Sequence, residues 1–547
     1  MKMMQIEGQL PVNLVNWLLA LVPIVVLLIL LVALRWKATA AGPVGMFAAM
    51  LIGLLVFQTP LMTLAVASAK GVWDAIFILY VVWPALLLYR ITNQAGAFDA
   101  LRAGIEGFSR NDLFLVLAFA WVFASFLQGI AGFGTPIAVV APLLVALGVK
   151  PLFAVVLPLI GHAWANMFGT LAVGWLATIS VIDLADPTAT AFQTAILLWI
   201  PNLLGGFAIA WLFGRMAAIR HAWPLILIIS LLHGGIQLGL TLWDPVLSAF
   251  IAATVGLVAM YGLSRWKRFS EPAEQIDERH VMAEDSEGAA EQERQRKPIM
   301  GLGMAMLPYI VLTVAAVLGL VIGPVEETLG QFEVGLPFPQ VATGYGIVRE
   351  AEDPFSPFAP LTHPGTFLLI ASLVAWIVYK RRGYYDKWAE RTETESLWAG
   401  LTGDAVPASV AILSFLVLSQ VMDHSGQITV LAQGIVAVTP PVVYAFLANW
   451  IGVLGAFMTS SNTASNVLFA PLQQTVASLE ALPEEAIIGA QSTGGAIGNA
   501  IAPANVVLGT GTAGIIGREG AVLRKTLVWS VIAAVLVGLA TLLLLGL

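Results

Sequence analysis

The sequence predicts an all-α polytopic membrane protein, with about 12 transmembrane helices and two re-entrant hairpins in two inverted-topology repeats. The first observation is composition: 59% of the 547 residues are apolar, 11% are charged, and the mean hydropathy is +0.88. The second is that charge-free segments such as 14–34 and 526–545 are long enough to cross the hydrocarbon core as helices. The third is a self-similarity at a spacing of 330 residues. This composition excludes a soluble multidomain protein.

Hydrophobic segments separated by charged or Gly/Pro-rich stretches predict the order of the spans. Two of these segments, 112–149 and 441–482, are interrupted by small or polar residues, so we expect each to be a hairpin that returns to its own side. The remaining segments are expected to cross, at 14–34, 42–59, 71–90, 151–178, 193–214, 224–242, 245–263, 299–323, 364–379, 398–421, 484–516 and 526–545.

Composition shifts along the chain predict its domain organisation. Residues 1–223 form the first repeat, with its hairpin at 112–149, and 224–263 form a connecting helix pair. Residues 264–298 are dense in charge and poor in large apolar side chains, which is typical of a disordered linker. Residues 299–547 form the second repeat, with its hairpin at 441–482, and include a long loop at 324–362 after the first span.

The distribution of basic residues predicts the orientation. With these spans, all but three of the 26 Lys and Arg residues fall on one side of the membrane, and the exceptions are Lys2, Lys70 and Arg349. The positive-inside rule makes the basic side cytoplasmic. We therefore expect a multi-pass protein of the bacterial cytoplasmic membrane with both termini outside.

The internal repeat brings the two interrupted segments into register. Shifting the chain by 330 residues superimposes Asp74 on Asp404, Gly96 on Gly426, and GIAGFGTP (129–136) on TSSNTASN (459–466). With a short further shift, Gly161-x4-Asn166 meets Gly494-x4-Asn499. The predicted topology places the two copies in opposite orientations, which is the architecture of secondary transporters that bind substrate near the midplane.

The interruptions are the candidate substrate site. Non-helical backbone at membrane depth is tolerated only where protein or a water-lined cavity surrounds it, and the N-terminus of a half-helix attracts anions. Packing by small residues and interhelical hydrogen bonds is the alternative interpretation. The substrate-binding candidates are Gly132, Gly134, Thr135, Asn166, Ser460, Ser461, Asn462, Thr463, Asn466 and Asn499.

Four titratable residues within or at the ends of predicted spans are candidates for proton coupling or gating: His162, Asp74, Asp404 and Asp423. His162 lies in the middle of a span, where it could instead be a satisfied packing residue. The two aspartates at repeat-equivalent places could simply complement helix N-termini. Asp423 lies at the outer end of a span.

Three blocks of sequence resemble the L-lactate permease family. They are SFLQGIAGFGTPIAVVAPLL, TSSNTASNVLFAPLQ, and QSTGGAIGNAIAPANVV followed by GIIGREGAVLRKT. The resemblance implies transport of L-lactate, D-lactate and glycolate, generally with protons. The tip Ser461-Asn462-Thr463 also looks like the Ser-Asn-Thr motif of divalent anion/sodium symporters. Gln128 and Asn462 depart from the acidic residues that family members often carry.

The sequence therefore predicts a secondary active transporter of small 2-hydroxymonocarboxylates, most simply a proton symporter. The absence of Lys and Arg deep in any predicted span favours a single carboxylate over a dicarboxylate. A sodium-coupled organic anion symporter, with sodium at the hairpin tips, and a passive anion channel are the alternatives.

The expected partners are a small carboxylate, a coupling cation, H+ or Na+, and the lipid bilayer, with a homodimer left open. No catalytic constellation, nucleotide-binding loop or metal-spaced cluster is found, and the chain has no cysteine. We expect no cofactor, no bound metal, no nucleic acid and no enzymatic activity.

Overall fold

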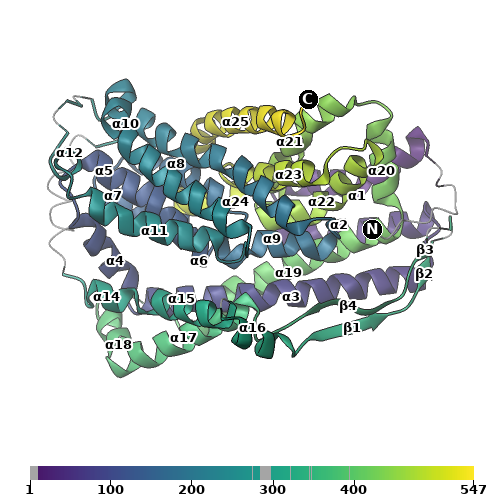
Figure 1. The fold of residues 1–547 in the computed structure, drawn as a ribbon, viewed down its shortest axis with the longest axis horizontal. Coiled ribbons are helices and arrows are strands. Elements are labelled where there is room, and N and C mark those ends of the chain that lie inside the picture. The colour runs from purple at the N-terminus through teal and green to yellow at the C-terminus, as the bar shows by residue number, and fades with distance from the viewer. Residues whose placement is uncertain are drawn as a thin grey trace.

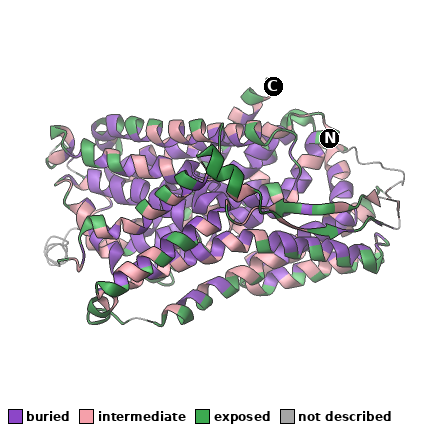
Figure 2. Cartoon of the chain, turned by 60° about the horizontal axis from the view of Figure 1, so that its bottom comes forward, coloured by how far each residue is buried: buried purple, intermediate pink, exposed green. Residues whose placement is uncertain are grey.

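The computed structural model is almost entirely helical, with two short β-ribbons (Figure 1). It describes residues 10, 12–273, 275–276, 278–283, 297–320, 322–343, 345–346, 348–393 and 395–547. Buried residues concentrate in the middle of the helix bundle, and exposed ones lie mainly at its outer helices and ends (Figure 2).

Within these residues, eight helices are long and apolar enough to cross a membrane. A ninth span would be the pair Leu307–Leu320 and Gly323–Gly330, which is bent by 82°. The polytopic helical class is confirmed. The number of twelve crossings and the inverted repeat stay predictions.

The first half of the chain contains helices α1 to α12. They are α1 (Leu14–Leu28, continued by a π-helical turn Ile29–Ala33), α2 (Ala38–Leu55), α3 (Leu61–Gln94), α4 (Ala97–Glu106), α5 (Asp112–Leu117, continued by a π-helical turn Ala118–Phe123), α6 (Ala124–Ile130), α7 (Thr135–Ala146), α8 (Pro151–Gly161, followed by a 3₁₀ turn Ala163–Ala165), α9 (Gly169–Val181), α10 (Pro187–Thr241), α11 (Ser248–Leu263) and α12 (Lys267–Ser270).

The second half contains α14 (Leu302–Ala305), α15 (Leu307–Leu320), α16 (Gly323–Gly330), β1 (Val334–Phe338), β2 (Val341–Ala342), β3 (Val348–Arg349), β4 (Glu352–Phe358), α17 (Pro364–Arg381), α18 (Tyr384–Ala389), α19 (Leu397–His424), α20 (Gln427–Val436), α21 (Pro441–Thr459), α22 (Asn462–Leu479), α23 (Glu484–Asn499), α24 (Pro503–Thr512) and α25 (Glu519–Leu544).

Proline and short polar residues mark many helix starts. Helices α8, α10, α21 and α24 begin with proline, which fits the first helical position because the N–H it lacks would have no partner there. The side chains of Asn13, Asn111, Asp186 and Ser461 accept backbone N–H groups at the starts of α1, α5, α10 and α22. Local sequence thus determines where the apolar segments begin as helices.

The spacing of 330 residues recurs in the helix boundaries. Helix α3 ends at residue 94 and α19 at residue 424, and the next helices span 97–106 and 427–436. Gly96 and Gly426 separate them with φ angles of +70° and +84°, a conformation that glycine adopts without steric cost. This coincidence supports the predicted repeat.

Two antiparallel helical hairpins occupy the segments predicted for them. The first consists of α5–α6 and α7, and the second of α21 and α22. In the second, Ser465 Oγ donates to the carbonyl of Gly452 at 2.9 Å, and Gln473 Nε2 donates to that of Ala448 at 2.9 Å. These bonds fix the register of α22 along α21.

Helix α10 is a further hairpin, which accounts for the two spans predicted between 193 and 242. A straight helix of 55 residues would extend about 80 Å, far beyond the thickness of a bilayer. The chain reverses at Gly214 and Arg215, which have non-helical backbone angles. Trp199 Nε1, before this turn, donates to Ser230 Oγ, after it, at 3.1 Å.

Helices α3 and α19 pack antiparallel in a long, close crossing that lies in the lower half of the view in Figure 1. The backbones approach closely at Gly71, where an added Cβ would lie 2.6 Å from Cα of Val417. Because α3 begins at Leu61 rather than near residue 71, Asp74 lies more than three turns from the helix start. The interpretation of Asp74 as an acid that complements a helix N-terminus is therefore wrong.

Residues 324–362, predicted as a long loop, contain α16 and the four strands. The ribbon β1–β4 packs on α3 through an apolar cluster of Val66, Trp73, Phe338, Val341 and Phe355. The strands have only two to seven residues, which is too few for an alternation of apolar and polar side chains to predict them.

The segment 264–298, predicted to be disordered, differs from that expectation in its described part. Phe269, Ile276 and Val281 are buried, and Lys150 Nζ donates to the carbonyl of His280 at 3.0 Å. A few apolar residues within a charged segment therefore suffice to hold it against the helices. The rest of the prediction falls on 284–296, outside the described residues.

Gly71→Ala tests the close crossing of α3 and α19. The added methyl group must displace backbone of α19, so we expect a loss of about 1–3 kcal/mol in the free energy of unfolding, measured by denaturant titration in detergent. Gly403→Ala is the matched control, since an added Cβ there meets nothing within 4 Å. Equal stability of the two variants would contradict the described contact.

Candidate functional site

The second hairpin turns over within two residues. Helix α21 ends at Thr459, Ser460 adopts a left-handed conformation with φ +57°, and α22 begins at Asn462. Ser461 Oγ accepts the N–H of Ala464 at 3.2 Å and so caps α22. The polar sequence at this tip is therefore partly explained by the need to end one helix and begin another.

The amides of α22 contact the interrupted span that follows the first hairpin. Asn462 and Asn466 are 3% and 0% exposed, and their Nδ2 atoms lie 3.7 and 3.2 Å from Sδ of Met167. Gln491 of α23 reaches Oδ1 of Asn466 at 3.4 Å. An added Cβ at Gly495 would lie 2.2 Å from Oδ1 of Asn462, so glycine is required there for the amide to fit.

The two interrupted spans meet through their asparagines. Asn499 Nδ2 donates to Oδ1 of Asn166 at 2.9 Å, although 333 residues separate them. Asn166 in turn donates to the carbonyl of Ala163 at 2.9 Å and to that of Ala496 at 3.3 Å. Asn505 Nδ2 donates to the side-chain and main-chain oxygens of Asn499. The structure therefore brings together the two asparagines that the repeat made equivalent.

The first hairpin tip lies against the same region. The backbone N–H of Gly132 donates to Oγ1 of Thr170 at 2.8 Å, and an added Cβ at Gly132 would lie 2.5 Å from that oxygen. Gly134 has a φ of +89° and immediately precedes α7, which starts at the buried Thr135. Phe133 between the two glycines is 41% exposed.

Three helix N-termini converge where the tips and the second break meet. The N–H of Ala504, in the first turn of α24, donates to Oγ of Ser460 at 3.2 Å, next to the start of α22. An added Cβ at Gly134, at the start of α7, would lie 3.8 Å from Oδ1 of Asn505. Ser460, Gly134 and Asn505 are all partly exposed, so the region is accessible. Aligned N-termini create a positive potential without any charged side chain.

No Lys or Arg lies in the segments that form this region, 124–140, 161–175, 455–470 and 491–513. Within the described part of the chain there is also no group of three or more His, Cys, Asp or Glu residues that could hold a metal ion. The arrangement can therefore bind a small anion by helix dipoles, N–H groups and neutral amides.

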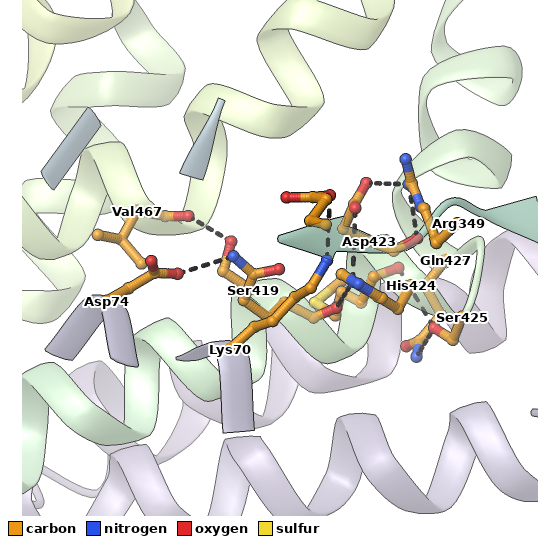
Figure 3. Close-up of polar contacts among 12 residues, drawn as sticks. Lys70, Asp74, Arg349, Ser419, Asp423, His424, Ser425, Gln427 and Val467 are labelled. Atoms are coloured by element: carbon orange, nitrogen blue, oxygen red, sulfur yellow. Dashed lines mark hydrogen bonds and ion pairs between the residues drawn. The ribbon is translucent and has the colours of Figure 1, made fainter. Parts of the chain in front are cut away.

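Of the four titratable candidates, His162 lies in the first interrupted span and the three aspartates lie on α3 and α19, and each has its own partner. His162 Nδ1 bonds the carbonyl of Pro158 in its own helix. Asp404 forms an ion pair with Arg90 at 2.6 Å. Asp74 and Asp423 lie in a polar cluster on α3 and α19, where Asp423 pairs with Arg349 at 2.7 Å (Figure 3).

The residues with direct side-chain contacts to the predicted site that were not among the candidates include Met167, Thr170, Gln491 and Asn505. All of these lie inside the interrupted blocks, so proximity in sequence to Asn166 and Asn499 was the available signal. Thr463, which was predicted to bind substrate, is 9% exposed and lies in the first turn of α22.

Helical hairpins, interrupted spans and an accessible anion-attracting region define a polytopic membrane transporter rather than an enzyme. The family model described as L-lactate permease matches residues 16–547. The chain belongs to the L-lactate permease family, which confirms the resemblance found in the three sequence blocks.

Named relatives agree over nearly the whole length. Glycolate permease GlcA of Escherichia coli is 27% identical over 548 residues, which cover 96% of this chain and 95% of the relative. L-lactate permease of Halalkalibacterium halodurans is 26% identical over 532 residues, covering 94% of each chain. A crystal structure of the Alcanivorax borkumensis YdaH transporter has a TM-score of 0.36 and 15% identity, with 85% of each chain covered, and supports no argument about this site.

A double-mutant cycle on Asn166 and Asn499 tests the junction of the two breaks. Each single change to alanine leaves one polar atom of the other amide, Oδ1 of Asn166 or Nδ2 of Asn499, without its partner, so we expect each to cost about 1–3 kcal/mol in the free energy of unfolding. The double variant should cost less than the sum by about 0.5–3 kcal/mol, measured by denaturant titration.

The control pair for this cycle is Asn499→Ala with Thr402→Val, since Thr402 bonds only carbonyls of its own helix and lies far away on α19. Those two changes should be additive. Additivity in the Asn166 and Asn499 pair as well would mean that the two amides do not interact.

Proposed function

We propose that this protein is a secondary active transporter of small 2-hydroxymonocarboxylates, L-lactate, D-lactate or glycolate, driven by protons. Membership of the L-lactate permease family supports the substrate class, since relatives over the whole chain are named for lactate and glycolate. The coupling ion and the direction of transport belong to the proposal.

The observation that supports this function most directly is the convergence of the α7, α22 and α24 N-termini on Ser460, Gly134 and Asn505. The substrate carboxylate binds there to free N–H groups and helix dipoles. The 2-hydroxyl group binds an amide of Asn499 or Asn505, which lie beside one another. The carboxylate of the substrate thus matches the helix N-termini, and its hydroxyl group matches the cluster of amides.

Charge favours a monocarboxylate. A second carboxylate would have to be stripped of water without a Lys or Arg in the surrounding segments, which costs several kcal/mol. Specificity for a single negative charge follows from this lack of cations.

In the proposed cycle, the two hairpins and the broken spans move against the remaining helices, and the site opens alternately to each side. The distribution of Lys and Arg supports a cytoplasmic-membrane protein with both termini outside. A homodimer through the outer helices is compatible with this cycle.

Uptake of labelled L-lactate and glycolate into proteoliposomes tests the function. A gradient of about one pH unit, acid outside, should drive about tenfold accumulation if one proton accompanies each substrate anion. A sodium gradient alone should drive none. Equilibration without accumulation would identify a passive channel, and accumulation driven only by sodium would contradict proton coupling.

Asn462→Ala and Thr135→Val test the two hairpin tips. Both residues are buried at starts of helices in the proposed site, so we expect each change to lower lactate uptake by about tenfold or more, from lost hydrogen bonds to a charged ligand. Thr402→Val on the exposed face of α19 is the control and should transport normally. Normal uptake in both tip variants, at equal protein levels, would remove the tips from the site.

A further inference from the structure

Asp74 is a carboxyl group buried in the middle of α3 without a cationic partner. The residue is 1% exposed, and Gln420 Nε2 of α19 donates to its Oδ2 at 2.8 Å. Its other oxygen, Oδ1, has no hydrogen-bond partner among the described residues. Holding an ionised carboxylate in such a place is costly, whereas a neutral acid is tolerated.

The repeat supplies an internal comparison for this pair. At the spacing of 330 residues, Asp74 corresponds to Asp404, and Arg90 corresponds to Gln420. Across the antiparallel crossing, Asp404 bonds Arg90 at 2.6 Å and Asp74 bonds Gln420 at 2.8 Å. The two contacts occupy equivalent positions, but an amide replaces the guanidinium, and Asp74 is 1% exposed whereas the Asp404 side chain is 35% exposed. Asp404 therefore has a permanent counter-ion, and Asp74 has none.

The charged groups around Asp74 are occupied by other partners (Figure 3). Lys70, one turn away on α3, bonds Glu352 of β4 at 3.2 Å. Arg349 of β3 pairs with Asp423 of α19 at 2.7 Å.

Two histidines also face this part of α3. His424 of α19 bonds the carbonyl of Gln420 through Nδ1 at 2.9 Å, and its Nε2 has no partner among the described residues. The ring of His363, at the start of α17, lies 4.8 Å from that of Phe77. Helices α2, α9 and α22, which also pack near this crossing, carry no titratable side chain.

The cluster is connected to the second hairpin through α19. Ser419 Oγ, next to Gln420, donates to the carbonyl of Val467 in α22 at 2.7 Å. That carbonyl lacks its usual intrahelical donor because residue 471 is proline. Gln420, the partner of Asp74, is therefore the sequence neighbour of a residue that bonds directly to the hairpin carrying Asn462 and Asn466.

From these contacts we propose that Asp74 binds and releases the proton that accompanies the substrate. This inference rests on the proposed proton-driven transport. On the outer side, a hydronium ion gives its proton to the Asp74 carboxylate. The neutral acid persists while loaded hairpins reorient, and the same proton passes to water on the inner side.

Two variants prevent Asp74 from binding and releasing a proton and so test the proposal. Asp74→Asn mimics the protonated acid, and Gln420→Arg supplies the counter-ion that Arg90 gives to Asp404. Both variants should exchange internal for external labelled lactate at about the wild-type rate, because exchange needs no net proton movement. Neither should accumulate lactate under a gradient of about one pH unit, where the wild type reaches about tenfold.

Asp404→Asn is the matched control, and should keep pH-driven accumulation because Asp404 is paired with Arg90. Accumulation by Asp74→Asn at the wild-type level would overturn the role of Asp74 while leaving the transporter function intact. Failure of the wild type to accumulate lactate would instead overturn proton-driven transport, and the inference with it.

Infrared spectroscopy of the purified protein provides a readout independent of transport. The carbonyl stretch of a buried protonated carboxyl group should be present in the wild type and in Asp404→Asn, and absent in Asp74→Asn and Gln420→Arg. An unchanged band in Asp74→Asn would overturn the proposal, even if that variant also lost transport through misfolding.

Discussion

A polar backbone group inside a bilayer must find its partner within the protein, and the centre of this molecule depends on that constraint. The chain is non-helical at two hairpin tips and in two broken spans, and each interruption is satisfied by another. Thr170 of the first broken span accepts the N–H of Gly132 in the first tip, and Ser460 of the second tip accepts the N–H of Ala504. These hydrogen bonds form only when the tips and the broken spans are packed together. The result is a compact junction of neutral amides and helix ends.

The antiparallel crossing of α3 and α19 organises the electrostatics in the same way. The contact of Asp74 with Gln420 and that of Asp404 with Arg90 occupy equivalent places in the two copies, so a difference between the copies becomes a difference between two sites in one molecule. An arginine at residue 90 and a glutamine at residue 420 give the partly exposed Asp404 and the buried Asp74 unlike environments. The ribbon β1–β4 covers the end of this crossing, and its Glu352 forms an ion pair with Lys70.

Much of the architecture was predictable because hydropathy and breaks in hydropathy are local properties. The hairpins, the division of α10 and the contact of Asn166 with Asn499 agree with expectations from spacing and apolar length. The packed part of the linker and the short strands were not predictable, since both depend on tertiary contacts of a few apolar residues such as Phe269 and Phe355. The partner of Asp74 required knowing which faces of α3 and α19 meet.

The proline at residue 471 has a consequence beyond local helix geometry. In the middle of α22 it leaves a single carbonyl, that of Val467, free to accept from another helix, and Ser419 takes it. A hairpin sliding along α19 would find no second acceptor of this kind one turn earlier or later in the middle of α22. The N–H that Pro471 lacks thus creates the acceptor by which Ser419 fixes the position of α22 along α19 in this conformation.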